Sequence, residues 1–145
     1  MTAKLKHGIT KVKDPGSALT HFIAMILAII AAMPLLSKAG HDSGHMHISA
    51  LAVFILSMIG LYAASTIYHT LDISPKINKL LRKIDHMMIF ILIAGTYTPV
   101  CMIVLGDKTG WTMLTLVWGI AIVGILINAL WITCPKWFSS LIYIA

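Results

Sequence analysis

The stretch Ile48–Leu71, ISALAVFILSMIGLYAASTIYHTL, decides the fold class of this chain. It contains no Asp, Glu, Lys or Arg. It is also longer than the roughly 20 residues with which a helix crosses about 30 Å of hydrocarbon. The stretch therefore predicts a transmembrane helix, and it carries polar residues toward one end, at Ser65 and His69.

Further stretches without acidic or basic residues extend this pattern over most of the 145 residues. They are Ala18–Ser37, His86–Gly106 and Thr109–Pro135. The composition is 59% hydrophobic and 11% charged, with a mean hydropathy of +0.91, which leaves too little polar surface to cover a water-soluble globule. We therefore predict an all-α, polytopic transmembrane helix bundle that forms one membrane domain over 1–145, and kinks at Pro34 and Pro99.

The predicted spans are four complete helices and the start of a fifth. Their approximate ranges are 18–37, 48–69, 86–106, 110–133 and 137–145. The last run is too short to cross a bilayer as a helix. It is either an interfacial segment or, as we expect, the first part of a further span, so that the chain is a truncated form of a longer protein.

The basic residues predict the orientation, because Lys and Arg near span ends are retained on the cytoplasmic side. They gather before the first span and between the second and third: Lys4, Lys6, Lys11, Lys13, Lys76, Lys79, Arg82 and Lys83. The other two loops hold only Lys38 and Lys108. We expect a multi-pass protein of the cell membrane with a cytoplasmic N-terminus. Because the net charge of +6 is divided among loops, it favours contact with anionic membrane lipid and argues against nucleic acid as a partner.

Ser65, His69 and Asp85 are the candidate site residues. Ser65 and His69 are four residues apart and share a helix face, and Asp85 lies across a short loop at the same membrane surface. A neutral imidazole binds zinc, a carboxylate can hold or deprotonate water, and a hydroxyl can donate to a developing oxyanion. Two structural alternatives stay open: Asp85 caps a helix that begins at His86, or Ser65 bonds to its own backbone.

Several longer segments resemble the bacterial hemolysin III family. They are Ser17–His21, Ala64–Leu71, Leu80–His86, Leu92–Pro99 and Gly110–Gly119, with the sequences SALTH, ASTIYHTL, LLRKIDH, LIAGTYTP and GWTMLTLVWG. The resemblance covers nearly all of the chain. That family belongs with the progestin and adipoQ receptors and the alkaline ceramidases, a group of seven-span membrane proteins.

The resemblance implies a zinc cofactor and the hydrolysis of a lipid amide. Its shared serine corresponds to Ser65, its first histidine to His69 as a metal ligand, and its aspartate to Asp85, which orients or activates water and is a second candidate ligand. The family's other two histidines lie in a His-x-x-x-His motif on the last span, and no counterpart occurs in this sequence. His21 matches a family position and is expected to be structural, whereas His86 points about 100° away from Asp85 around the helix.

Two alternatives to a hydrolase remain at this stage. The family name suggests a pore-forming cytolysin that perturbs membranes, although a polytopic protein with basic inner loops is an unusual design for a secreted lytic factor. The other alternative is a nonfunctional, truncated product.

Overall fold

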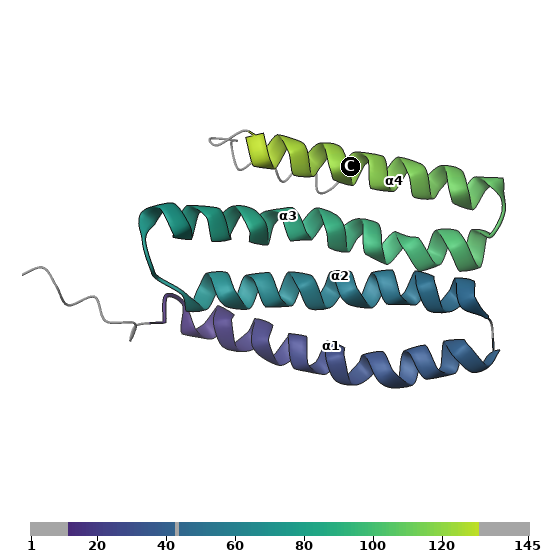
Figure 1. Cartoon of the computed structure of the whole chain (residues 1–145), viewed down its shortest axis with the longest axis horizontal. Helices are drawn as coiled ribbons and strands as arrows, with labels where there is room; N and C mark the ends of the chain where they lie inside the picture. The colour runs from purple at the N-terminus through teal and green to yellow at the C-terminus, as the bar shows by residue number, and fades with distance from the viewer. Residues whose placement is uncertain (1–11, 43, 131–145) are drawn as a thin grey trace, which may run out of the picture.

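A computed structural model describes residues 12–42 and 44–130 of the chain. Every regular element in those residues is a helix, and the long helices run back and forth in chain order (Figure 1). They are α1 (Pro15–Asp42), α2 (His45–Thr70), α3 (Pro75–Pro99), the π-helix η1 (Val100–Leu105) and α4 (Lys108–Leu130). The predicted fifth run, 137–145, lies outside the described residues.

The predicted fold class is confirmed. Four helical stretches are long and apolar enough to cross a membrane, and α3 with η1 forms one of them, 31 residues long. The helices extend beyond the charge-free stretches that predict them, most clearly at α3, which begins at Pro75. A charged residue marks the edge of the hydrocarbon but does not end the helix. Lys and Arg, like Leu, are good helix formers, so the helix continues past them.

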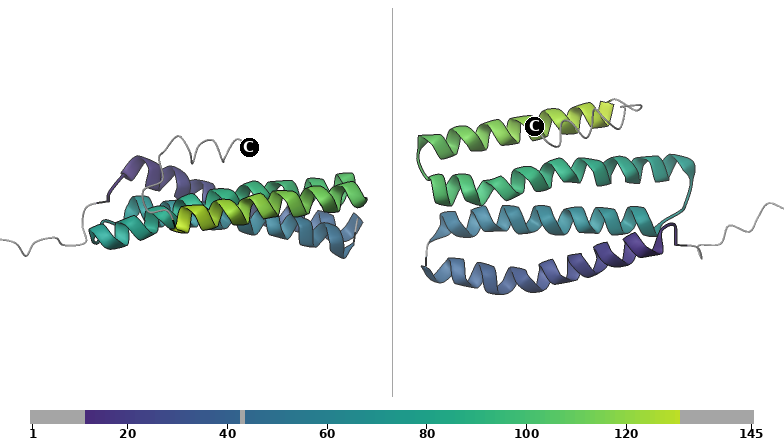
Figure 2. Two further views of the ribbon diagram at one scale, coloured as in Figure 1. Left: turned by 90° about the horizontal axis from the view of Figure 1, so that it is seen from above. Right: turned by 180° about the vertical axis from the view of Figure 1, so that it is seen from behind.

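The four helices lie side by side in a single layer, each next to its neighbours in the chain (Figures 1 and 2). Few apolar side chains of the described residues are accordingly buried, and Phe90, Ala94 and Ala121 form a buried cluster between α3 and α4. Many large apolar side chains are exposed instead, among them Met33 at 77% and Leu130 at 79%. Apolar surface on this scale is typical of a protein that lipid or further protein surrounds.

Small residues let neighbouring helices approach closely. A Cβ atom on Gly95 of α3 would collide with the side chain of Ser57 on α2. A Cβ atom on Gly124 of α4 would likewise collide with the ring of Phe90 on α3. Membrane helices associate through such packing, because lipid tails remove the hydrophobic driving force that operates in water. These two glycines therefore set the spacing of α2, α3 and α4.

Turn chemistry fixes the helix ends that position the polar residues. The Ser74 hydroxyl accepts a hydrogen bond from the Ile77 backbone N–H at 3.3 Å, and Pro75 follows as the first residue of α3. A serine cap followed by proline is a strong helix start. At the other end, Gly106 closes η1 with a φ of 56°, which a glycine adopts without strain.

The region after Pro99 differs from the simple kink that the sequence predicts. The α-helix ends at Pro99, and the chain continues as the π-helix η1, with the Gly106 N–H donating to the Cys101 carbonyl at 3.2 Å. Proline lacks an N–H and so interrupts the α-helical hydrogen bonds. Here the helix continues after the proline as the wider π-helix η1, so the span is not broken.

Candidate functional site at the basic end

Ser65 and Asp85 meet between α2 and α3. The Ser65 hydroxyl donates a hydrogen bond to Oδ1 of Asp85, and the two residues are only 5% and 8% exposed. Asp85 lies about three turns into α3, so the expectation that it could cap a helix starting at His86 is wrong. Ser65 likewise bonds across to another helix. The structure thus brings together two of the three candidate residues that the sequence indicates.

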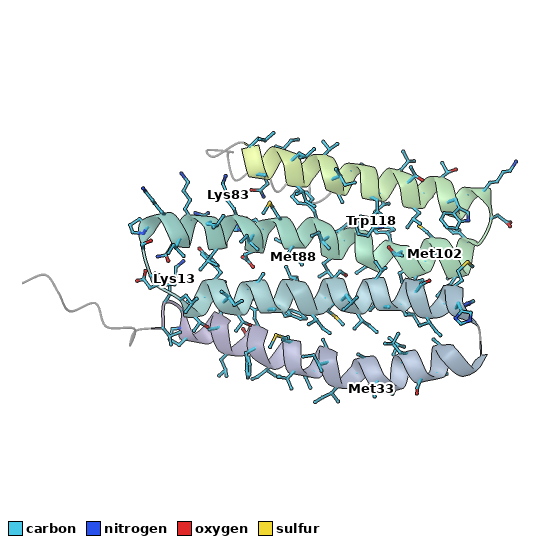
Figure 3. All side chains as sticks on the ribbon, viewed as in Figure 1. Lys13, Met33, Lys83, Met88, Met102 and Trp118 are labelled. Carbon is cyan, nitrogen blue, oxygen red and sulfur yellow. The ribbon has the colours of Figure 1, made fainter. Side chains whose placement is uncertain are left out.

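These residues lie at the end of the layer where α2 ends and α3 begins, which we call the basic end. Its described basic residues are Lys13, Lys76, Lys79, Arg82 and Lys83. Figure 3 labels Lys13 and Lys83 at this end of the layer. That the basic end faces the cytoplasm stays a prediction from the charges.

His86 lies beside the carboxylate of Asp85. Its Nδ1 is 3.7 Å from Oδ2 of Asp85 and 2.8 Å from the carbonyl oxygen of Arg82. The rotation of about 100° between adjacent helix positions suggests separation, but an imidazole is long enough to turn back toward its neighbour. His86 is therefore part of the polar surroundings of Asp85, which the spacing alone does not indicate.

His69 contacts the start of α1, at His21, and Asp14, the residue that precedes α1. Its Nδ1 lies 3.4 Å from Oδ2 of Asp14, and its ring stacks on that of His21, with 5.7 Å between centroids and 17° between planes. The Tyr68 ring adds an edge contact at 4.8 Å. His21, for which a structural role is expected, therefore contacts His69 by ring stacking.

Sequence reasoning missed Asp14 as a partner of His69. Asp14 precedes Pro15 and accepts a hydrogen bond from the Ser17 hydroxyl at 2.7 Å. Aspartate directly before proline is a helix-start signal, and it could have placed a carboxylate at this end of α1. The Ser17 hydroxyl holds the pKa of the exposed Asp14 carboxyl below its usual value, and the nearby His69 lowers that pKa further.

Comparison with known proteins gives a single family. The Haemolysin-III related family model matches residues 9–145, which is nearly the entire chain. The chain belongs to the Haemolysin-III related family. With its four apolar helices, this Haemolysin-III related protein is a multi-pass membrane protein.

Two bacterial relatives are similar over most of this chain. Hemolysin-3 of Bacillus cereus is 37% identical over 145 residues, which are 99% of this chain and 66% of that protein. A Hemolysin-3 homolog of Bacillus subtilis strain 168 is 34% identical over 132 residues, 91% of this chain and 62% of that protein. The chain spans about two thirds of the length of these Haemolysin-III related relatives. No solved structure matches it significantly.

The resemblance implies a zinc ion, so the donor side chains of this Haemolysin-III related chain should lie close enough together to bind one. Among residues 12–42 and 44–130, no three His, Cys, Asp or Glu side chains are grouped so that they could hold a metal ion. His69 is turned to Asp14, and Asp85 accepts from Ser65. Since zinc sites use at least three protein ligands, the described residues do not fit a complete zinc site.

Proposed function

We propose that this protein is a membrane hydrolase that cleaves an amide bond of a membrane lipid at the basic end. The observation that carries the proposal is the buried Ser65–Asp85 pair between two transmembrane helices. Polar residues buried between membrane helices are costly and tend to be functional. A carboxylate and a hydroxyl together supply a proton acceptor and a hydrogen-bond donor, which amide hydrolysis needs.

The depth of the pair suits such a substrate. The charge-free part of α3 and η1 begins directly after Asp85 and continues to Leu105. Asp85 therefore lies where hydrocarbon gives way to headgroups. A lipid amide joins the acyl chain to the headgroup at this same level, so the bond can reach the pair without leaving the membrane.

The chemistry assigned to the pair is general base catalysis with oxyanion stabilisation. Asp85 accepts a proton from a water molecule, and the resulting hydroxide attacks the amide carbonyl carbon. The Ser65 hydroxyl, which donates to Asp85 at rest, donates to the carbonyl oxygen as negative charge develops there. The C–N bond then breaks, the proton on Asp85 passes to the leaving amine, and the products are a carboxylic acid and an amine.

Zinc binding is a separate part of the proposal, with His69 and Asp85 as its described donors. A zinc ion would polarise the amide carbonyl. Because the described residues do not complete its coordination, no step above depends on it. The measurement is zinc content after purification without chelators, where His69→Ala is expected to lower the zinc-to-protein ratio. An unchanged ratio would remove His69 from the proposal.

Hydrolysis is tested with purified protein and a fluorescent long-chain N-acyl amino alcohol in mixed micelles. Asp85→Asn is expected to lower the rate about 100-fold or more, the usual contribution of a general base. Ser65→Ala should lower it by roughly 100-fold to 1,000-fold.

Ser57→Ala is the matched control for these variants. It removes another buried α2 serine, whose hydroxyl donates to the Phe54 carbonyl within the same helix at 2.7 Å. Equal rates for Asp85→Asn and Ser57→Ala would contradict the proposal.

Membrane lysis is a second candidate, favoured by the name Hemolysin-3 of the relatives. It is measured as dye release from liposomes on addition of purified protein. An unrelated four-span membrane protein at the same protein-to-lipid ratio is the control. Release equal to this control would reject lysis, and release that persists in Asp85→Asn would separate lysis from hydrolysis.

A further inference from the structure

The transmembrane helix formed by α3 and η1 is longer than a bilayer requires. Its 31 residues span roughly 45 Å at about 1.5 Å per residue, against a hydrocarbon thickness of about 30 Å. Its charge-free part occupies residues 86–105. The surplus therefore lies at the start, in residues 75–85, which continue from the edge of the hydrocarbon through the lipid headgroups.

This surplus segment carries an exposed apolar stripe. Ile77, Leu80 and Ile84 are separated by three and four residues, so they lie on one side of the helix, and they are 39%, 56% and 37% exposed. Ile73, just before the helix, is 59% exposed. We call these four residues the α3 stripe. A segment that simply projected into water would gain nothing from such a stripe.

Basic residues lie on the other sides of this helix segment. Lys83 is already engaged, since its ammonium donates to the carbonyl oxygen of Ala129 near the end of α4 at 2.8 Å. Lys76, Lys79 and Arg82 are exposed, and they form no ion pair with residues 12–42 and 44–130. These three residues, the α3 cations, carry charge that the described part of the protein leaves uncompensated.

The nearby carboxylates already interact with other residues of the protein. Asp72 accepts a hydrogen bond from the Asn78 side chain at 2.6 Å. Asp85 is buried and accepts from Ser65. Asp14 is taken by Ser17 and His69. The α3 cations are therefore available to an external anion.

We propose that residues 73–84 form a binding surface for anionic phospholipid, with the α3 stripe inserted among the lipids and the α3 cations on their phosphates. An apolar side with basic residues on the remaining helix surface is the pattern of an interfacial helix segment. Long basic side chains can extend along apolar surface while their charged ends reach the phosphate level. The continuity of this segment with a membrane span favours lipid over an acidic protein, because the span holds the segment at the membrane surface.

The test uses the intact purified protein in neutral detergent. Its result therefore does not depend on which side of the membrane the basic end faces. Retention of phosphatidylglycerol and of phosphatidylcholine is measured by native mass spectrometry. We expect preferential retention of phosphatidylglycerol, and we expect that preference to decline between about 50 mM and 500 mM salt as the charges are screened. No preference at low salt would overturn the proposal without any variant.

Substitutions test whether the α3 cations form the lipid-binding surface. Replacing the α3 cations together, Lys76→Gln with Lys79→Gln and Arg82→Gln, is expected to reduce the preference about tenfold or more, since each basic residue contributes to attraction by anionic lipid. The matched control is Lys38→Gln with Lys108→Gln at the other end of the layer, which should keep the preference. An equal effect of both sets would overturn the assignment to α3.

The contribution of the α3 stripe is measured separately, by the retention of both lipids. Ile77→Ser with Leu80→Ser is expected to lower retention of both lipids, because it removes insertion while leaving the charges. An acidic peptide, polyglutamate, tests the other class of partner. Saturable binding of this peptide to the α3 cations without preference for phosphatidylglycerol would overturn the lipid assignment.

Discussion

Asp14 and His69 are joined by both backbone and side chain. The Asp14 N–H donates to the His69 carbonyl at 2.9 Å, and the Asp14 carboxylate lies 3.4 Å from Nδ1 of His69. The first contact satisfies a carbonyl at the end of α2, which an isolated helix would leave unpaired. The second orients the His69 ring. The start of α1 therefore holds a candidate site residue of α2 in place.

Asp14→Asn should lower thermal stability in detergent near neutral pH and make the difference from the parent protein depend on pH. The pKa of Asp14 is lowered in the folded protein, chiefly by the Ser17 hydroxyl. A carboxyl with a depressed pKa stabilises the fold above its unfolded pKa, and this contribution is lost as pH falls through its folded pKa. Melting curves of both proteins should therefore converge in acid.

Asp107→Asn is the control for this pH dependence. Asp107 is exposed in the loop between η1 and α4, far along the chain from His69. If its melting difference from the parent protein changes with pH as that of Asp14→Asn does, the effect is general surface charge and not the contact with His69.

The Ser65–Asp85 hydrogen bond should appear as coupling in a double-mutant cycle. Ser65→Ala leaves a buried carboxylate without its hydroxyl donor, which is expected to cost about 1–3 kcal/mol. Adding Asp85→Ala should cost less in this background than in the parent protein, because the partner is already absent. Unfolding in a denaturing detergent measures all four proteins. Additive effects would show that the bond contributes nothing to stability.

Gly124→Leu should separate α4 from α3. The new side chain would occupy the space of the Phe90 ring, and overpacking of this kind typically costs about 1–3 kcal/mol. Gly119→Leu is a close control on the same helix, because a Cβ atom there meets no other atom within 4 Å. Crosslinking between cysteines introduced on α3 and α4 should fall only in the Gly124 variant. Equal loss in both would indicate that the whole helix, and not this contact, is sensitive.

The four long apolar helices and the proximity of Ser65 to Asp85 could be predicted because each depends on one strong rule. Charge-free stretches locate hydrocarbon, and alternating topology places the end of α2 beside the start of α3. The surroundings of His69 could not be predicted in this way. They depend on where α1 starts relative to the end of α2 and on which way an imidazole at the last turn of a helix points, and neither follows from residue spacing.

Pro99 and His86 show the same limit on a smaller scale. A proline in a span predicts an interruption, but whether the helix bends or widens into η1 depends on how its neighbours pack. The Trp118 indole N–H donates to the Thr98 hydroxyl at 3.2 Å, so α4 contributes to the structure at this point. For His86, helix geometry gives the direction of the Cα–Cβ bond but not the rotamer that brings its ring beside Asp85.

The single layer of helices also bears on how the protein is made. Packing is almost entirely between helices that are consecutive in the chain, so each new span meets its partner as soon as it enters the membrane. Contacts between sequence neighbours form with little loop-closure cost. Assembly can therefore follow synthesis helix by helix, with Asp85 paired by Ser65 once α3 is inserted, before α4 has left the ribosome.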